Sequence, residues 1–443
     1  MSYNLENLFM KLKNLQILLS MGISILFIYF YDYFLTESLV SQQFWCIEVY
    51  KEFNIQNINN IRLPIHCDEG PYRLASESLE NFFDKNNPYQ GRPLFVFLIF
   101  LIRNAVDFFS MNSFDEYTTF RISMFVLQSI ILFFILKTFI SIVKINFETK
   151  LDYVILFLII GIPSIRWNLF LSAVGNLTFL IFLISIHYTI NVDRKNKSNK
   201  YYLLLGVLSL AHQSAIIYGL IIKLFEFLKY KKINFKNSSI NLGWLVAFQL
   251  IYRFIVNVSK YDFYDWHKEE HNQFYWILSA INNSENLEYC QTFQTFIKCN
   301  NFVTRNYIGY FFIIMLYFFL LLILSRKQEH QLSSIIVNSF FINIFIFIFW
   351  SAQGTYEAFR FINYSIGYFL FFSTCIFCIL FNKNKFLILS LIFYQYSILY
   401  LEPYNIELNS PQINFMTWIS LLFFVIFILN HFLNYKNIRS SKK

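Results

Sequence analysis

Runs of about twenty predominantly apolar residues recur along almost the whole chain, and this pattern limits the folds that are open to it. A helix that crosses the hydrocarbon core of a bilayer needs about 20 such residues. The sequence of 443 residues is 56% hydrophobic and only 14% charged, whereas an ordinary soluble domain carries about a quarter charged residues. One soluble core cannot bury so much apolar surface, so we expect a bilayer to be the solvent.

The apolar runs predict an all-α, polytopic integral membrane protein that forms a single membrane domain over residues 1–443. We expect about eleven to thirteen transmembrane helices, because the run at 201–228 fits either one long helix or two short ones. The predicted spans are residues 13–36, 93–111, 117–137, 151–165, 168–191, 201–228, 240–258, 306–325, 333–351, 358–381, 386–402 and 412–433.

Clusters of lysine and arginine between the spans predict the orientation, because cytoplasmic loops carry an excess of these residues. Lys11 and Lys13 and a basic tail place both termini inside, which leaves two larger extracytoplasmic loops at 37–92 and 259–305. The net charge of +9 follows from the inner loops, so we expect no nucleic-acid partner. The first run, residues 15–35, is too long for a cleavable signal and lacks a small-residue cleavage site.

One stretch conflicts with this orientation. Two complete crossings between Pro93 and Lys137 would place Lys137, Lys144 and Lys150 outside, although basic residues are expected inside. Either one of these segments is only half-inserted or this loop is an exception, and the sequence leaves both alternatives open.

The first outer loop carries an acidic pair, Asp68 and Glu69. A carboxylate just outside a membrane can deprotonate an acceptor hydroxyl, or hold a divalent metal such as Mg²⁺ or Mn²⁺ beside a phosphate. A solvated acidic turn or a helix N-cap would have the same sequence. After the pair, residues 74–83 space their apolar side chains as a helix lying in the membrane interface would.

Arginines inside apolar spans are costly, so each marks a functional site or an internal ion pair. Arg103 and Asp107 stand four residues apart and are expected to pair with each other. Arg253 has no partner within its own span. Arg360, three residues after Glu357, can grip a lipid phosphate bidentately or pair with that glutamate.

Histidines supply further candidates. His212, in LSLAHQSAIIYG, falls where a short helical hairpin would turn within the membrane, and it fits either a catalytic or a structural histidine. Arg166 and Asn176 lie near the outer end of a span pair and are expected to line the same cavity. His267 and His271 stand four residues apart, but the order HExxH is absent, so a metal is not expected there.

Four cysteines fall in the two loops predicted outside: Cys46 and Cys67 in the first, Cys290 and Cys299 in the second. Two disulfides would fit an oxidising compartment, and four free thiols fit the sequence equally because spacing does not test the geometry. The chain has no P-loop, GxGxxG, GxSxG or CxxCH motif, which argues against ATPase, dinucleotide-dependent or serine-hydrolase chemistry.

The first half of the chain combines several motifs in a recognisable order. After one span comes a long outer loop with DEGPYRLASESL, which runs through NPYQGRPLFVFLIFLI into the second span, and FRISMFVLQ and IPSIRWNLFLSAVGNLTFLIFL follow. Over roughly residues 1–230 this order resembles the membrane-embedded GT-C glycosyltransferases, in particular the mannosyl- and aminoarabinose-transferase branch, although the motifs are loose. The residues that match the family's acidic, Tyr, Ala and Arg-Pro positions are Asp68, Tyr72, Ala75, Arg92 and Pro93.

The resemblance implies transfer of a hexose or pentose from a polyprenyl-phosphate donor at the outer face of the bacterial inner membrane. The acceptor would be a glycan, a lipid or a protein, and the product a cell-surface glycan. Asp68 would be the base or metal-associated group, with Glu69 as its substitute, and Arg360 or Arg253 would steady the leaving phosphate. The family usually has a second acidic residue after the fourth span. This chain has Asn176 there, which puts a two-carboxylate site in doubt.

Two other functions fit parts of the sequence. The stretch LAHQSAIIYGL is similar to the His-x-Ser-Ala stretch of the EpsG/Wzy-type polysaccharide polymerases, and that resemblance makes His212, Arg166 and Arg360 the catalytic and phosphate-binding set. A flippase for lipid-linked glycans, or another transporter, would also be polytopic and rich in intramembrane arginine. Transporters often contain internal repeats, and none is evident here.

Overall fold

The computed structural model describes residues 69–82, 90–111, 113–146, 175–191, 198–230, 235–259 and 337–346, with a few single residues elsewhere. The chain divides into two compact units, and the second unit, Phe44–Asn146 with Asn168–Ile366, holds all of these longer segments. Within the described ranges every regular element is a helix, which confirms the all-α prediction for this part of the chain.

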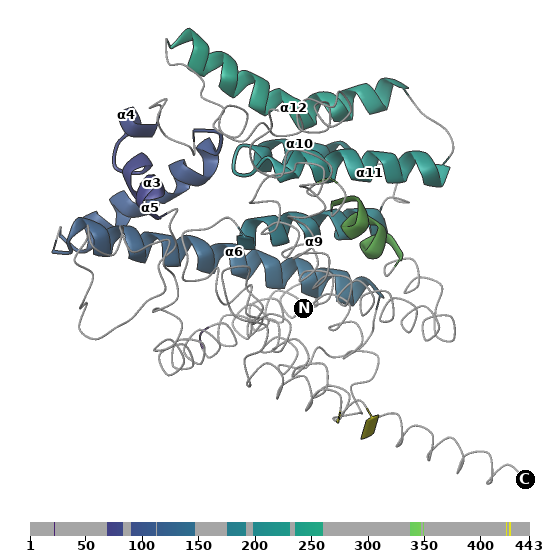
Figure 1. The fold of residues 1–443 in the computed structure, drawn as a ribbon, viewed down its shortest axis with the longest axis horizontal. Coiled ribbons are helices and arrows are strands. Elements are labelled where there is room, and N and C mark those ends of the chain that lie inside the picture. Colours follow the sequence, from purple (N-terminus) through teal and green to yellow (C-terminus); the bar gives the residue numbers. More distant parts are fainter. Residues whose placement is uncertain are drawn as a thin grey trace, which may run out of the picture. The chain divides into compact units, whose positions relative to one another are not determined.

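Eight helices follow one another in the described residues between Glu69 and Val258 (Figure 1). They are α3 (Glu69–Ala75), α4 (Leu79–Phe82), α5 (Pro93–Phe109), α6 (Glu116–Asn146), α9 (Gly175–Asn191), α10 (Ser198–Ser209), α11 (Ser214–Tyr230) and α12 (Phe235–Val258).

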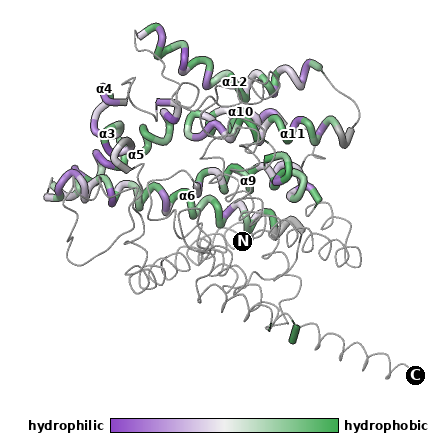
Figure 2. Tube along the Cα trace, in the orientation of Figure 1, coloured by the Kyte–Doolittle hydropathy of each residue, from purple (hydrophilic) through white to green (hydrophobic). Residues whose placement is uncertain are grey.

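Two of the helices are long and apolar enough to cross a bilayer, by length and composition alone: Glu116–Ile142 within α6, and α12. Gly175–Thr189 is a shorter apolar helix, and a further one lies at Val337–Ile346. Figure 2 shows apolar residues along most of α6 and α9, whereas α3 and α4 are mixed. The predicted spans 93–111, 117–137 and 240–258 thus correspond to α5, α6 and α12, and α6 extends nine residues further.

Each of these helices packs against particular neighbours. α12 lies against α10 and α11, α11 lies against α9, α9 against α6, and α6 against α5. Two side-chain contacts show that α6 and α9 run in the same direction: Asn176 reaches Gln128 at 3.3 Å, and further along both helices His187 reaches Ser141 at 3.1 Å.

α10 and α11 form a short hairpin, as the second alternative for 201–228 predicted. With 12 and 17 residues they are about 18 and 25 Å long at 1.5 Å per residue, shorter than the roughly 30 Å core of a bilayer. The hairpin turn, Leu210–Gln213, contains His212. Gly206 allows close packing beneath the turn, because an added Cβ would lie 2.2 Å from the Trp244 carbonyl oxygen of α12.

The segment after Asp68, which was predicted to lie in the first outer loop, differs from the prediction in its helices. Instead of one interfacial helix over residues 74–83, the chain forms α3 and α4 with a break between them. Hydroxyl groups cause the break: Ser76 Oγ donates to the Arg73 carbonyl as α3 ends, and Ser78 Oγ accepts from the Asn81 N–H as α4 begins. The buried side chains are those of Tyr72, Ala75 and Ser76, whereas Leu74 is exposed.

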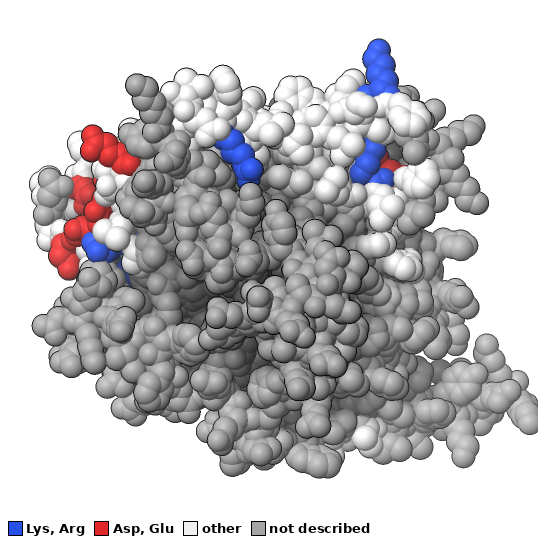
Figure 3. All heavy atoms as spheres, turned by 45° about the horizontal axis from the view of Figure 1, so that its top comes forward, with Lys and Arg blue, Asp and Glu red and all other residues white. Residues whose placement is uncertain are grey.

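The described bundle has two ends of opposite charge. The acidic end comprises α3, α4, the last turns of α5 and the first turn of α6, with Glu77, Glu80, Asp107, Asp115 and Glu116. The basic end is where α6, α9 and α11 finish and α10 and α12 begin, and its described lysines are Lys200, Lys223 and Lys236. In Figure 3 most of the visible acidic side chains gather on one side of the surface around a basic group, and the other visible basic side chains lie apart from them.

Candidate functional site

Three segments distant in sequence meet inside the bundle. We call this place the interior junction: Gln90–Pro93, the hairpin turn, and Gln249 with Tyr252 of α12. The Leu94 N–H donates to the Leu210 carbonyl at 3.0 Å, which joins the start of α5 to the hairpin turn. A Cβ on Gly91 would lie 3.3 Å from Gln213 Nε2, so glycine permits this approach.

Two side chains of α12 form hydrogen bonds to the other two segments of the junction. Gln249 Nε2 donates to the Ser209 carbonyl at 2.6 Å, and the Tyr252 hydroxyl donates to the Gln90 carbonyl at 2.8 Å. Both contacts are buried. Buried backbone carbonyls need hydrogen-bond donors. These two side chains supply donors to the carbonyls of the residues that precede α5 and end α10.

Arg92 enters the junction from the start of α5. It stands at the N-cap position, with Pro93 at the first turn and no side chain capping the helix. Its Nη1 donates to the Tyr72 hydroxyl at 2.5 Å. Tyr72 is fully buried and packs edge-on against Phe95, with ring centroids 5.4 Å apart. Tyr72 and Arg92, two of the residues that match positions of the family and were expected to bind substrate, are therefore in direct contact.

His212 forms hydrogen bonds within the hairpin turn. The Ser214 N–H donates to His212 Nδ1 at 3.3 Å, and the Ser214 hydroxyl lies 2.7 Å from the same nitrogen. Because a backbone N–H can only donate, Nδ1 is an acceptor, and in the neutral ring the proton is on Nε2. The imidazole thus caps the amino end of α11, next to the start of α5.

Two other predicted residues, Asn176 and Arg253, lie on α9 and α12. Asn176 faces α6, where its Nδ2 donates to Gln128, and its Oδ1 is buried without a hydrogen-bond partner. Arg253 is exposed on α12, because its neighbour Tyr252 occupies the inward face of the helix.

The remaining predicted residues cannot be placed. Glu69 opens α3, but its side chain is outside the described set. Also outside the described residues are Asp68, Arg166, Glu357, Arg360, His267, His271, Cys46, Cys67, Cys290 and Cys299.

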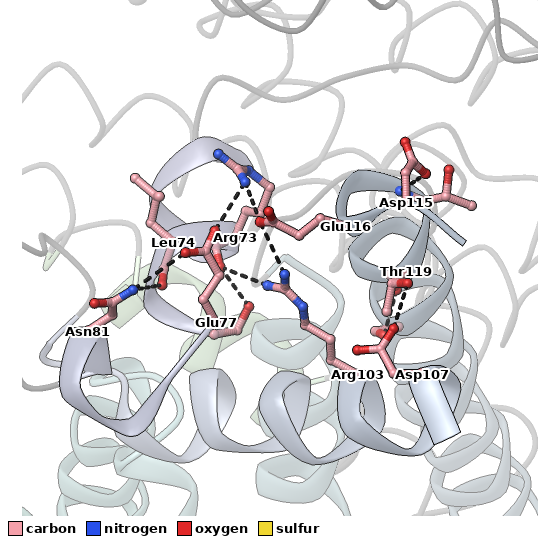
Figure 4. A network of polar contacts seen from close by, with 12 residues as sticks. Arg73, Leu74, Glu77, Asn81, Arg103, Asp107, Asp115, Glu116 and Thr119 are labelled. Carbon is pink, nitrogen blue, oxygen red and sulfur yellow. Dashed lines mark hydrogen bonds and ion pairs between the residues drawn. The ribbon is translucent and has the colours of Figure 1, made fainter. Parts of the chain in front are cut away.

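The acidic end holds a charged cluster that the sequence did not reveal (Figure 4). Arg73 Nη1 lies 3.0 Å from Glu77 and also pairs with Glu116. Arg103 Nη2 lies 3.1 Å from Glu116, and its Nη1 donates to the Arg73 carbonyl at 3.2 Å. We call Arg73, Glu77, Arg103 and Glu116 the clasp, because they join α3 to α5 and α6.

The expected pair of Arg103 with Asp107 was wrong. Asp107 instead accepts from the Thr119 hydroxyl at 2.8 Å, and Arg103 turns to Glu116. Spacing along one helix could not show this, since α6 folds back along α5 and offers a carboxylate from another helix. A local signal did exist for Asp115, which caps α6 through the Thr118 N–H at 3.0 Å.

A second polar group lies at the basic end. The Tyr188 hydroxyl donates to Glu226 at 2.5 Å, and Lys223 Nζ lies 2.7 Å from the same carboxylate. His187 Nδ1 lies 2.8 Å from the Tyr201 hydroxyl. These contacts join α9 to α10 and α11, far along the helices from the hairpin turn.

No family model, no curated protein and no solved structure matches this chain.

The described residues do not fit a divalent metal. Within the described ranges, no three or more His, Cys, Asp or Glu side chains come together in a group that could hold one. The paired carboxyls of the clasp face two arginines, which repel a cation. The metal predicted beside Asp68 stays a prediction, since that residue lies outside the described set.

Proposed function

We propose that this protein is a polytopic membrane glycosyltransferase that moves a sugar from a polyprenyl-phosphate carrier to an acceptor at the outer face of the bacterial inner membrane. The observation that carries the proposal is the interior junction. There the amino ends of α5 and α11 lie together, and helix amino ends attract anions. Arg92 adds a guanidinium, which matches phosphate geometry.

The proposed base is tied to this junction by a short stretch of chain. Asp68 directly precedes α3, and Tyr72 of α3 holds Arg92. In the proposed reaction Asp68 takes the proton of the acceptor hydroxyl, whose oxygen bonds to the anomeric carbon of the sugar. The bond from that carbon to the carrier phosphate breaks, and the electron pair leaves with the phosphate. Arg92 offsets the charge that develops there.

An apolar cavity beside α5 suits the lipid part of the donor. It has a volume of about 600 Å³ and is open to the surface. Its walls come from α5 and α6, including Leu101, Ile102, Val106, Phe109 and Val126. An isoprenoid chain lying there would bury apolar surface of both partners.

A topology in which α5 does not cross the membrane would remove the conflict over Lys137. α5 has 17 residues and starts at the hairpin turn, and Arg103 and Asp107 reach the start of α6. We propose that α5 only dips into the membrane from the outside, and that α6 alone crosses it. Lys137 and Lys144 then lie toward the inside with the other basic loops, as the excess of basic residues predicts.

A transporter is the second candidate, and one observation favours it. Short helices that end against each other within a bundle, as α5 and α10 do, are common where transporters bind substrate. The polymerase has less support than the transporter. The histidine that suggested a polymerase, His212, caps α11, and this structural role is enough to explain its presence.

Sugar transfer by the purified protein separates these functions. With a radiolabelled polyprenyl-phosphate sugar and an acceptor in detergent, we expect label in a new glycosidic product. A transporter forms no such bond, so recovery of all label on the carrier, with the protein folded, would reject the proposed enzyme.

A further inference from the structure

α5 and α10 together occupy the length of α6. At the acidic end, Asp107 near the end of α5 accepts a hydrogen bond from Thr119 in the first turns of α6. At the basic end, the two ring nitrogens of His187 contact Tyr201 at the start of α10 and Ser141 near the end of α6. The amino end of α5 and the carboxyl end of α10 meet between these two levels, at the interior junction. The two short helices therefore resemble one transmembrane helix that is broken at the junction.

In the proposed topology, in which α6 crosses the membrane, the break lies deep in the bilayer. α5 has 17 residues, α10 has 12 and α6 has 31, which correspond to about 25, 18 and 46 Å of helix. The hydrocarbon core is about 30 Å thick. A break about 25 Å from one end of α6 and about 18 Å from the other therefore lies inside this core. Backbone that leaves a helix at such a depth is either buried in protein or faces water.

Gln213, in the hairpin turn at this break, is exposed, although His212 and Ser214 on either side of it are buried. Its amide lies over Gly91, where an added Cβ would be 3.3 Å from Nε2. Gly91 and Arg92 are themselves only half-buried. Hydrocarbon offers an exposed amide no hydrogen-bond partner, which is costly. The space that Gln213 faces therefore holds water.

The surface differs on the two sides of the break. Toward the acidic end, α3 lies beside α5, where Tyr72 packs on Phe95 and Arg73 pairs with the exposed Glu116. Polar side chains thus continue from Arg92 to the outer end of α6. Toward the basic end, the exposed side chains of α10 and α11 nearest the turn are leucines, which suit lipid: Leu203, Leu204, Leu220 and Leu224. Water is therefore expected to enter from the acidic end, which is the outer end in the proposed topology.

We propose that the interior junction is the floor of a water-filled vestibule that opens to the outer face and reaches deep into the membrane. Gln213 and Arg92 face this vestibule, and α3 forms part of its wall. The identity of the occupant rests on the proposed function: it is the sugar-phosphate headgroup of the polyprenyl donor. Gln213 then contacts the sugar, because an amide can donate to one hydroxyl and accept from another.

Cysteine accessibility measures the vestibule without any substrate. Spheroplasts that produce full-length Gln213→Cys are treated with a membrane-impermeant, anionic methanethiosulfonate. Peptide mass spectrometry then quantifies modification at residue 213 and reads the native cysteines separately. We expect this thiol to react at least about tenfold faster than the thiol of Leu250→Cys, because the reactive thiolate forms in water and not in hydrocarbon.

Leu250→Cys is the matched control for depth. Leu250 follows Gln249, whose side chain reaches the Ser209 carbonyl at the end of α10, so it lies at the level of the junction. The Leu250 side chain is 62% exposed, and an exposed apolar side chain at this depth is expected to face lipid. Glu80→Cys at the acidic end and Lys236→Cys at the basic end, both exposed, report the two faces. In spheroplasts the first should react and the second should not.

Equally slow reaction of Gln213→Cys and Leu250→Cys would overturn the vestibule, because no water would reach the junction. Fast reaction of Gln213→Cys that requires access from the inner face, in inverted vesicles, would overturn its outward opening.

The sugar-transfer assay tests the occupant separately. Gln213→Ala should raise KM for the donor about tenfold with a smaller change in kcat, because hydrogen bonds to the sugar are lost. An unchanged KM would show that Gln213 does not contact the sugar. Labelling of Gln213→Cys from outside, without any transfer by the wild type, would reject the proposed function alone. Transfer by the wild type, with Gln213→Cys unreactive, would reject the vestibule alone.

Discussion

α5 is held at two places by different chemistry. At its start, the segments of the interior junction are joined by a backbone contact and by the buried, neutral side chains of Gln249 and Tyr252. Arg92, the charged residue of the junction, bonds to Tyr72. Further along, the clasp uses four charged side chains, and the Glu116 side chain is 52% exposed. Neutral buried contacts do not respond to pH or salt, whereas partly exposed ion pairs respond to both. The contacts of the junction should therefore keep their strength when pH or salt changes, whereas the ion pairs of the clasp should become stronger or weaker.

The largest effect should come from Arg92, the charged group of the junction. Arg92→Ala is expected to lower sugar transfer on the order of 10²- to 10³-fold, because a charge-stabilising donor near the leaving group is lost. Lys236→Ala is the control: this exposed basic residue of α12 should change transfer less than about threefold. Equal losses in the two variants would mean that Arg92 has no special place in the reaction.

Packing beneath the hairpin turn gives the next effect. Gly206→Ala places a Cβ against the Trp244 carbonyl and should cost about 2 to 3 kcal/mol of stability, since backbone must move. Gly243→Ala in α12 meets nothing within 4 Å and should stabilise by up to about 1 kcal/mol through helix propensity. Thermal unfolding in detergent measures both, and similar midpoints would contradict the close approach of α10 and α12.

Arg103→Met should lower the free energy of unfolding by about 2 kcal/mol. The methionine keeps the apolar stem of the side chain but removes the charge that pairs with Glu116. Thermal unfolding of Arg103→Met and of the wild type in detergent measures this loss. An unchanged midpoint would show that the contact of Arg103 with Glu116 does not stabilise the protein.

The smallest effect is expected at the junction in Tyr252→Phe. Loss of the hydroxyl leaves the Gln90 carbonyl without this donor and should cost about 1 kcal/mol. This cost should be the same at about pH 6 and about pH 8, because neutral groups make the contact. A cost that changes across that interval would show that the two regions are coupled.

The length of the apolar runs was enough to predict where several helices lie. The apolar runs at 93–111 and 240–258 correspond to α5 and α12, and the break at His212 corresponds to the hairpin turn. The family resemblance brought Tyr72 and Arg92 to attention, and the structure joins them. The positions of these helices and of the turn could be predicted because run length and turn residues are local properties of the chain.

Contacts between helices could not be predicted in the same way. Glu116 is 43 residues from Arg73, and a single sequence does not show which distant carboxylate meets an arginine. The pairing of Arg103 with Asp107 was wrong for that reason. The serines that divide α3 from α4 were visible, but the apolar spacing of residues 74–83 suggested one continuous helix.

The most direct test of the account combines donor, acceptor and carboxylate in one experiment. Wild-type protein in nanodiscs is given a radiolabelled polyprenyl-phosphate sugar, alongside Asp68→Asn and a variant in which Asp68→Asn is combined with Glu69→Gln. We expect the wild type to form the labelled glycoside and the double variant to form none at the same protein level. Normal product from the double variant would contradict the central claim that a carboxylate beside α3 activates the acceptor.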